Sequence, residues 1–316
     1  MEKILITGAS GFFGSNLVHR LVQENYDVHI LTRESSNLWR LHEVYEQVTD
    51  WKCELTNATK LKEIIEFIQP QHIIHSATYG GRPFENEEQA IVQTNLMGIM
   101  NLLSACQDID FETFINTGSS SEYGLKETAM KESDACFPSS VYGISKLSST
   151  LYCDYCAKQW NKNIGTIRLF SPFGDFEDQG RLFPDLILNA IHNEPIYLSN
   201  PNAVRDFIYV QKAVDLYVEM IKEKKSIQGE IYNCGSGTQT SVLEVALQIK
   251  DITRSTSEIL IHPNPRKEQL VSTWVADVSK TTAHFNWKPT ASLHDELIQA
   301  CTWFKQHQNL YKGEKM

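Results

Sequence analysis

The stretch Lys3-Ile4-Leu5-Ile6-Thr7-Gly8-Ala9-Ser10-Gly11-Phe12-Phe13-Gly14-Ser15-Asn16-Leu17 decides the fold of this chain. A short apolar run, typical of a buried parallel strand, precedes three glycines at intervals of three and then a helical pattern. A strand, a glycine turn and a helix N-terminus together form an anion site, because free backbone N–H groups and the positive end of the helix dipole face one point. The stretch therefore predicts a site for the pyrophosphate of a dinucleotide.

Each glycine has a distinct expected role in this site. Gly8 permits the turn, Gly11 lets phosphate approach the backbone, and Gly14 lets the helix pack on the strand. The spacing G-x-x-G-x-x-G differs from the G-x-G-x-x-G fingerprint, so a glycine turn of another α/β protein stays open as an alternative. The residues of the turn expected to bind the dinucleotide are Gly8, Ser10, Gly11, Phe12, Phe13 and Gly14.

Composition limits the classes of partner and compartment. A net charge of −10 argues against a general nucleic-acid or membrane binder, which would carry a basic surplus. No apolar run approaches the ~20 residues of a membrane span, and the glycine motif at the start leaves no room for a signal peptide. Seven scattered cysteines fit reduced thiols better than a disulfide framework. We therefore expect a cytoplasmic protein with no membrane or nucleic-acid partner.

The first half alternates short β-branched runs with helical patterns, which is typical of an α/β doubly wound parallel sheet. Later strands are expected at 27–32, 48–52, 72–77, 113–118 and 164–169, and helices at 61–68, 88–107 and 142–161. After Phe170 the alternation stops, and loop-rich segments appear. The pattern predicts a dinucleotide-binding Rossmann domain over 1–170, with a returning segment at about 205–235, and a smaller substrate lobe over 171–204 and 236–316.

The end of the second expected strand bears on which dinucleotide binds. In Leu31-Thr32-Arg33-Glu34-Ser35-Ser36, Arg33 could make charge-assisted bonds to a 2′-phosphate, and Ser35 and Ser36 could add donors. These residues favour NADP. The alternative is a solvated Arg33, with Glu34 binding the ribose hydroxyls of NAD.

Tyr142 and Lys146 are four residues apart at the start of an expected helix, so both reach one cleft. A free phenol, with a pKa near ~10, is a poor acid–base group at neutral pH, and a neighbouring ammonium favours its ionised form. Lys146 would also hold the nicotinamide ribose. The pattern Y-x-x-x-K is weak alone, because it occurs by chance in many helices.

An upstream serine run, within Thr117–Gly124, strengthens this interpretation. A serine hydroxyl at the end of a strand could bond the substrate oxygen beside Tyr142. The distance in sequence from the end of the expected strand favours Ser119 as this serine, whereas the distance from Tyr123 and Gly124 favours Ser120. Both residues therefore remain candidates for the catalytic serine. The structural alternative for the run is a capping loop.

The ordered set of motifs resembles the extended short-chain dehydrogenase/reductase class, in particular its nucleotide-sugar epimerase/dehydratase/reductase family. The matching motifs, in chain order, are Gly8/Gly11/Gly14, His75-Ser76-Ala77, Asn95 with Gly98, the serine run, Tyr142/Lys146, Arg168–Gly174, Arg205–Val210, Asn233–Gly237 and Phe285–Pro289. The resemblance implies a Rossmann domain with a small substrate lobe, a nucleotide-diphosphate sugar as substrate, and a homodimer formed through two helices per subunit.

The resemblance also assigns roles to residues. It implies that the cofactor contacts Glu54, Leu55, Ala77, Asn95, Thr117, Phe170 and Pro172, besides the residues above. It implies that Arg205 and Arg266 grip the substrate pyrophosphate, and that weaker substrate positions are Thr78, Tyr79, Ser121 and Arg181. Metal sites are not expected, because the histidines are dispersed and Cys153-x-x-Cys156 falls within a helix with no second pair nearby.

Three reactions share hydride transfer with Tyr142 as the proton carrier. A 4,6-dehydratase needs a further acid and base, usually an Asp-Glu pair after the active-site threonine, and only Glu122 is present. Because Arg33 favours NADPH, the leading hypothesis is a reductase of a nucleotide-linked 4-keto-6-deoxyhexose, in deoxysugar synthesis for a polysaccharide or glycoside. The alternatives are a nucleotide-sugar epimerase with tightly bound NAD and, from another class, a non-catalytic nucleotide-binding scaffold.

Overall fold

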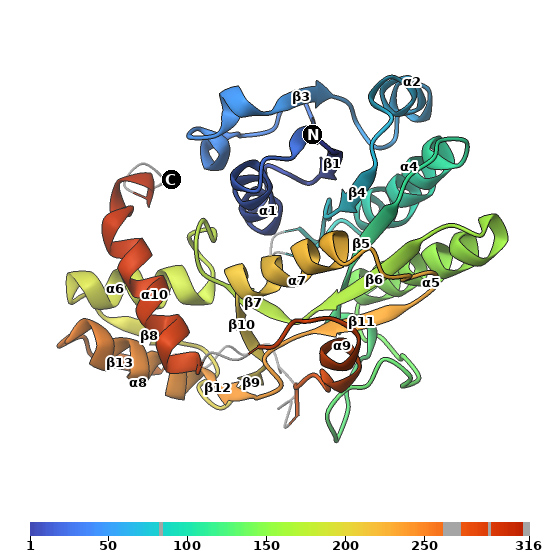
Figure 1. Ribbon diagram of the computed structural model, residues 1–316. Helices are drawn as coiled ribbons and strands as arrows, with labels where there is room; N and C mark the ends of the chain where they lie inside the picture. Colours follow the sequence, from blue (N-terminus) through green and yellow to red (C-terminus); the bar gives the residue numbers. More distant parts are fainter. Residues whose placement is uncertain (82–84, 262–272, 290–291, 312–316) are drawn as a thin grey trace.

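A seven-stranded parallel sheet forms the centre of the computed structural model, which describes residues 1–81, 85–261, 273–289 and 292–311 (Figure 1). The strand order is β11-β6-β5-β4-β1-β2-β3. The bounds are β1 Lys3–Thr7, β2 Asp27–Thr32, β3 Thr49–Lys52, β4 His72–His75, β5 Thr113–Ser119, β6 Ile164–Leu169 and β11 Ile231–Cys234. The sheet confirms the predicted doubly wound α/β fold.

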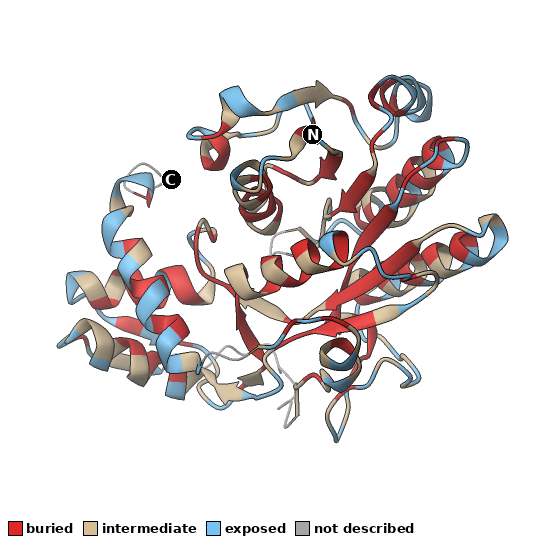
Figure 2. Ribbon diagram, in the orientation of Figure 1, coloured by how far each residue is buried: buried red, intermediate tan, exposed pale blue. Residues whose placement is uncertain are grey.

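Helices cover both faces of the sheet. α1 (Phe12–Gln23) and α7 (Val210–Lys222) pack together on one face, while α2 (Ala58–Ile68), α4 (Gly98–Cys106) and α5 (Val141–Trp160) cover the other. Successive strand residues point to opposite faces, so Ile4 and Ile6 enter one apolar core and Leu5 enters the other. This explains why the central strands are almost uniformly buried (Figure 2) and read as continuous apolar runs.

The later part of the chain builds a smaller layer beside the carboxyl ends of the strands. Its helices α6 (Leu182–His192), α8 (Val242–Thr253) and α10 (Leu293–Gln306) pack against one another. Its short paired strands are β7 (Ser171–Phe173) with β10 (Phe207–Tyr209), β8 (Ile196–Leu198) with β13 (Ile259–Ile261), and β9 (Val204–Arg205) with β12 (Thr240–Ser241). The remaining elements are η1 (Trp39–Leu41), η2 (Tyr45–Gln47), η4 (Ser120–Glu122), α9 (Ser279–His284) and η5 (Gln308–Tyr311).

The long helix expected over 88–107 is interrupted. α3 (Glu88–Val92) runs into a π-helical turn (Gln93–Met97) before α4 begins. The wider turn accompanies a hydrogen bond of 2.8 Å from Ser149 Oγ to the carbonyl of Asn95. Sequence periodicity does not register one extra residue in a turn, so the interruption was missed; π turns are often found at functional sites.

Two further observations concern the chain as a whole. All seven cysteines are free, and six of them are buried. Among the helices in the described parts of the chain, none combines the length and the apolar character that a membrane crossing requires.

Glu177 is a buried carboxyl where the segment after β7 meets the C-terminal η5. Its Oε2 accepts a 3.4 Å hydrogen bond from the Gly174 N–H, and its backbone carbonyl accepts one of 2.9 Å from the Tyr311 hydroxyl. Burial raises the pKa of this carboxyl to about 8. The folded state therefore binds a proton that the unfolded state releases near its ordinary pKa of 4.5.

Glu177→Gln should stabilise the protein at alkaline pH. Because the folded-state pKa lies above the unfolded one, the ionised carboxyl costs stability increasingly as pH rises from about 4.5 to about 8. Glutamine mimics the protonated form, so we expect roughly 2 kcal/mol of added unfolding free energy near pH 8.5 and far less near pH 5. Denaturant unfolding at both pH values measures this. The exposed Glu194→Gln is the control, and an equal gain at both pH values would contradict the prediction.

Candidate active site

The glycine turn joins β1 to α1 where the strand order reverses. Gly8 has φ +71°, and a Cβ on it would lie 2.5 Å from the Ala77 backbone nitrogen at the end of β4. A Cβ on Gly14 would lie 2.2 Å from the Gly8 carbonyl oxygen, so Gly14 packs on the turn rather than on the strand. Both positions admit only glycine, because the opposing atoms are backbone atoms that cannot move aside.

The turn leaves the first amides of α1 available for an anion. Gly11 is the N-cap and supplies no side-chain cap, and its own N–H donates to the Gly8 carbonyl at 3.0 Å. The first N–H groups of a helix have no partner within the helix. β1 and β4 are neighbours in the sheet, but α1 follows β1 on one face and α4 follows β4 on the other, so the turn lies at the switch point of the sheet. The residues present therefore fit a dinucleotide pyrophosphate.

The carboxyl ends of β2 and β3 form the expected adenosine side. Arg33, Glu34 and Ser35 are exposed, whereas Ser36 Oγ accepts the Arg33 N–H at 3.0 Å and so closes a turn. A cavity of about 600 Å³ includes Glu34 and exposed Glu54 in its lining. Of the residues discussed at the two strand ends, this lining contains Glu34 and Glu54 but not Arg33, Ser35 or Ser36.

Neighbouring packing fixes the loop after β3. Leu55 is half-buried against Gly98, and its carbonyl accepts a hydrogen bond of 2.9 Å from Asn101 Nδ2. A Cβ on Gly98 would approach Leu55 to 3.2 Å, which accounts for the glycine at the start of α4.

Asn95, in the π turn, connects three parts of the site. Its Oδ1 accepts hydrogen bonds from the Tyr79 N–H at 2.8 Å and the Thr78 hydroxyl at 3.2 Å. Its Nδ2 donates to the Tyr79 carbonyl and to Ser145 Oγ, both at 2.9 Å. The side chain is buried. Asn95 therefore holds the loop after β4 against α5, and its position in the structure is that of a support for Thr78 and Tyr79.

Tyr142 and Lys146 lie on one face of the first turns of α5. The Tyr142 phenol lies beside the side chains of Ser119 and Thr78, both of which act to lower its pKa. Lys146 is buried, and its Nζ donates to the Thr117 carbonyl at 2.6 Å. Three hydroxyls and one ammonium are thus gathered at the carboxyl ends of β4 and β5.

Burial dominates the electrostatics of this group. It raises the pKa of the Tyr142 phenol, while the interactions with Ser119 and Thr78 act in the opposite direction. Burial also lowers the pKa of Lys146 to about 8, although the carboxylate of Glu122 favours the charged ammonium. Perturbed groups gathered in one place are typical of an active site.

The structure distinguishes the three serines. Ser119 ends β5 with its side chain toward Tyr142, and its Oγ accepts the Ser121 N–H at 3.1 Å. Ser120 Oγ instead accepts a hydrogen bond of 3.2 Å from Trp274 Nε1. The backbone amide of Ser121 is thus used to orient Ser119.

A buried ion pair supports Ser119 from behind. Glu122 Oε1 accepts the Ser119 N–H at 2.8 Å, which completes a capping box around η4. Its Oε2 accepts from Arg168 Nε at 2.8 Å, and both side chains are almost fully buried. The capping loop given as the alternative for this serine run is thus present, with the S-x-x-E spacing of a capping box at Ser119 and Glu122. The sequence did not predict the ion pair of Glu122 with Arg168.

The predicted substrate side is only partly assembled in the described chain. Arg181, the N-cap of α6, donates from Nη2 to the Gly81 carbonyl at 3.0 Å, and its charge acts on Tyr142. Arg205 lies over the Trp274 ring at 5.2 Å, and this ring bonds Ser120. Arg266 lies outside the described residues.

Two of the residues expected to contact the cofactor, Phe170 and Pro172, follow β6. Phe170 is buried against Tyr123, and Pro172 is half-buried in β7. Both lie just beyond the carboxyl end of a central strand, the edge at which ligands bind in this kind of sheet.

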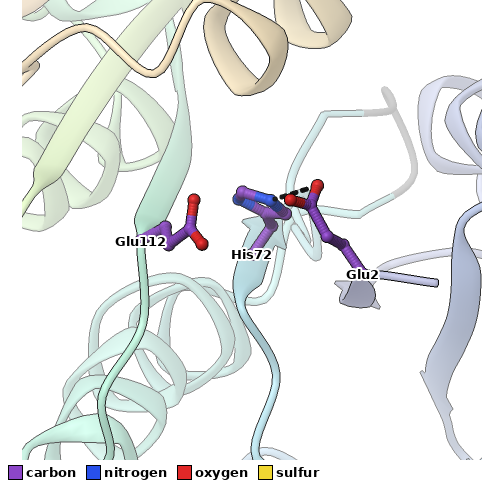
Figure 3. Close-up of side chains that lie close together, drawn as sticks. All are labelled: Glu2, His72 and Glu112. Atoms are coloured by element: carbon purple, nitrogen blue, oxygen red, sulfur yellow. Dashed lines mark hydrogen bonds and ion pairs between the residues drawn. The ribbon is translucent and has the colours of Figure 1, made fainter.

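One group of metal-type ligands occurs in the described part of the chain: Glu2, His72 and Glu112 (Figure 3). Lys224 Nζ lies 2.9 Å from carboxylate oxygens of both Glu2 and Glu112, so an ammonium already pairs with both carboxylates. His72 begins β4, which places the group at the opposite edge of the sheet from the glycine turn. It is a structural ion-pair group apart from the site.

Sequence comparison identifies the family. The profile of the NAD dependent epimerase/dehydratase family matches residues 4–235. This chain belongs to that family and is an enzyme of the extended short-chain dehydrogenase/reductase type.

Several relatives that align over their full length have names that include epimerase. An uncharacterised UDP-glucose epimerase of Bacillus subtilis is 28% identical and aligns over 99% of this chain and 100% of its own length. A UDP-glucuronate 4-epimerase of Thermodesulfobacterium geofontis is 26% identical over 100% of both chains. The crystal structure of UDP-glucuronic acid 4-epimerase from Bacillus cereus, with UDP-glucuronic acid and NAD, has a TM-score of 0.84 and 27% identity, covering 96% of this chain and 99% of that one.

These comparisons bear on two sequence predictions. The preference for NADP that Arg33 suggested is not supported, because the family is NAD dependent and similar structures contain NAD. Reduction of a 4-keto-6-deoxyhexose also finds no support, and the names of the relatives favour the epimerase alternative.

Proposed function

We propose that this protein is an NAD-dependent 4-epimerase of a UDP-sugar. The observation that carries the proposal is the Tyr142 phenol beside the side chains of Ser119 and Thr78 at the carboxyl end of the sheet, with Lys146 one helical turn away and bonded to the Thr117 carbonyl at 2.6 Å. A similar protein of known structure is an epimerase that binds UDP-glucuronic acid and NAD. Ser119 is proposed as the catalytic serine, because Ser120 is engaged by Trp274.

The residues of the chain would work as follows. The glycine turn and Lys146 would hold a dinucleotide that supplies the hydride acceptor and donor, together with a positive charge. Tyr142 would remove the proton of the sugar C4 hydroxyl while C4 gives up its hydride, and would return a proton to the C4 oxygen once the hydride has come back to the opposite face of the keto sugar. Ser119 would donate a hydrogen bond to the C4 oxygen in both steps. Arg205 and Arg266 would bind the pyrophosphate, which lets the keto sugar turn without leaving.

A dehydratase fits these residues poorly. That reaction needs a free acid and base beside the substrate, and Glu122 is buried with both carboxylate oxygens bonded, to Ser119 and Arg168. The epimerase needs neither group, because one phenol carries the proton in both directions.

The test uses purified protein with no added cofactor. We expect conversion of UDP-glucose or UDP-glucuronic acid into its C4 epimer, which nuclear magnetic resonance of the sugar measures. We also expect that denaturation of the protein releases NAD. Stoichiometric oxidation of added NADPH by a UDP- or dTDP-4-keto sugar, without epimerisation, would instead support the reductase.

The homodimer expected from the resemblance has a suitable surface. Exposed apolar side chains line α5 at Ile144, Leu151 and Tyr155, and the adjacent α3 and π turn add Val92 and Met97. α3 and α5 pack side by side. Exposed apolar side chains on neighbouring helices are typical of an oligomer interface, so we propose that two copies associate through them.

Leu151→Glu should give monomers. The side chain is 58% exposed, so the substitution costs the isolated subunit little, but it would place two charges in the symmetric interface. Light scattering coupled to size exclusion measures the mass. Leu247→Glu, on exposed α8, is the control and should stay dimeric. A dimeric Leu151→Glu variant would refute this interface.

A further inference from the structure

Arg40 contacts two segments that are far apart in the sequence. Its side chain, 5% exposed, donates from Nη1 to the Ser10 carbonyl at 3.2 Å and from Nε to the Phe176 carbonyl at 2.8 Å. Its Nη2 forms an ion pair with Asp178. Ser10 lies in the glycine turn, whereas the other two acceptors lie in the segment that joins β7 to α6. A planar guanidinium can serve three acceptors at once, and an ammonium cannot match that geometry.

The segment that Arg40 holds continues to the catalytic group. The Asp178 carbonyl accepts the Arg181 N–H at 3.2 Å, and Arg181 Nη2 donates to the Gly81 carbonyl at 3.0 Å. The Arg181 charge also acts on the Tyr142 phenol. One guanidinium therefore touches the cofactor turn and, through Asp178, fixes the start of the segment that ends beside Tyr142.

The backbone of this segment is in an unusual conformation. Phe176 has φ +65°, which a bulky residue rarely adopts. Its ring stacks on His19 at 4.9 Å, and His19 Nε2 is 2.7 Å from the Arg40 carbonyl. Asn16, on the first turns of α1, also donates to the Asp175 carbonyl at 2.8 Å. Such a backbone persists only while its surroundings hold it, so its conformation depends on the glycine turn and α1.

We propose that Arg40 is a positioning residue that couples the dinucleotide site to the nucleotide-sugar site. This inference rests on the proposed function, because it assigns the two ligands to these two regions. A dinucleotide that fixes the glycine turn also fixes Arg40, Asp178 and Arg181. The nucleotide-sugar at the second site therefore binds more tightly. Linkage requires the reciprocal effect: a bound nucleotide must strengthen the binding of the dinucleotide.

Release of NAD from the purified holoprotein tests the coupling without turnover. Its rate is followed by displacement with etheno-NAD, with and without saturating UDP. We expect UDP to slow the release of NAD about tenfold in the wild type and less than about twofold in Arg40→Lys. Lysine keeps the positive charge but loses the planar guanidinium that serves three acceptors. Arg20→Lys is the matched control, because Arg20 joins α1 to Asp215 and Glu24 away from the turn. It should retain the tenfold effect.

Asp178→Asn provides a second variant if Arg40→Lys does not fold. It removes the ion pair but leaves the contacts of Arg40 with Ser10 and Phe176, so we expect the effect of UDP to fall to about threefold. An undiminished tenfold effect in the folded variants, or no effect of UDP in the wild type, would overturn the proposal. Failure of the proposed function appears separately, as absence of epimerisation while UDP still slows release.

Discussion

Tyr142→Phe is expected to reduce turnover about 10³-fold, the usual range for loss of a general acid–base group. The phenol lies beside the side chains of Ser119 and Thr78, and in the proposed reaction it carries the proton of the sugar C4 hydroxyl. Phenylalanine keeps the ring and its packing on α5, so dinucleotide binding should persist. The measurements are the rate of C4 epimerisation and the amount of NAD released on denaturation.

Tyr197→Phe is the matched control, because it removes a hydroxyl at an exposed position on β8, outside the group formed by Tyr142, Ser119 and Thr78. Its rate should stay within about twofold of the wild type, as is usual for surface substitutions away from a site. Ser119→Ala should reduce the rate of epimerisation about 10²-fold, because the proposed hydrogen bond to the C4 oxygen is lost. Ser120→Ala should reduce this rate much less. If Tyr142→Phe kept a tenth of the activity, another group would have to carry the proton.

The parts of the molecule that depend on local pattern were predictable. The glycine turn after β1 and the strand Ile164–Leu169 are fixed by neighbouring residues, and both occur where the sequence indicated. The spacing of Tyr142 and Lys146 likewise needs only a helix to bring the two side chains to one face.

Contacts between distant segments were not predictable from local pattern. Ser119 and Ser120 are neighbours in sequence, and only the approach of Trp274 from a later segment separates their roles. The same holds for Arg40, whose acceptors Ser10 and Phe176 lie on opposite sides of it in the chain. The π turn at Asn95 was not predicted for another reason: one inserted residue hardly changes the period of a helical sequence pattern.

The pair of Glu122 and Arg168 is expected to matter more for stability than for chemistry. Glu122 accepts the Ser119 N–H and the Arg168 guanidinium in a site with almost no solvent access. Removing one member of a buried pair leaves an uncompensated charge, which costs about 3–5 kcal/mol, whereas replacing both by apolar groups is often nearly neutral. The same change also deprives the Ser119 amide of its acceptor.

Glu122→Ala should therefore lower the free energy of unfolding by about 3–5 kcal/mol in denaturant titration. The matched control is Glu244→Ala, which breaks the exposed capping box with Ser241 on α8 and should cost ~1 kcal/mol. Glu122→Leu combined with Arg168→Met should recover most of the loss, because no buried charge then lacks a partner. Equal losses for Glu122→Ala and Glu244→Ala would mean that solvent reaches the pair. In that case the β5 backbone alone, and not the pair of Glu122 and Arg168, would hold Ser119 in position.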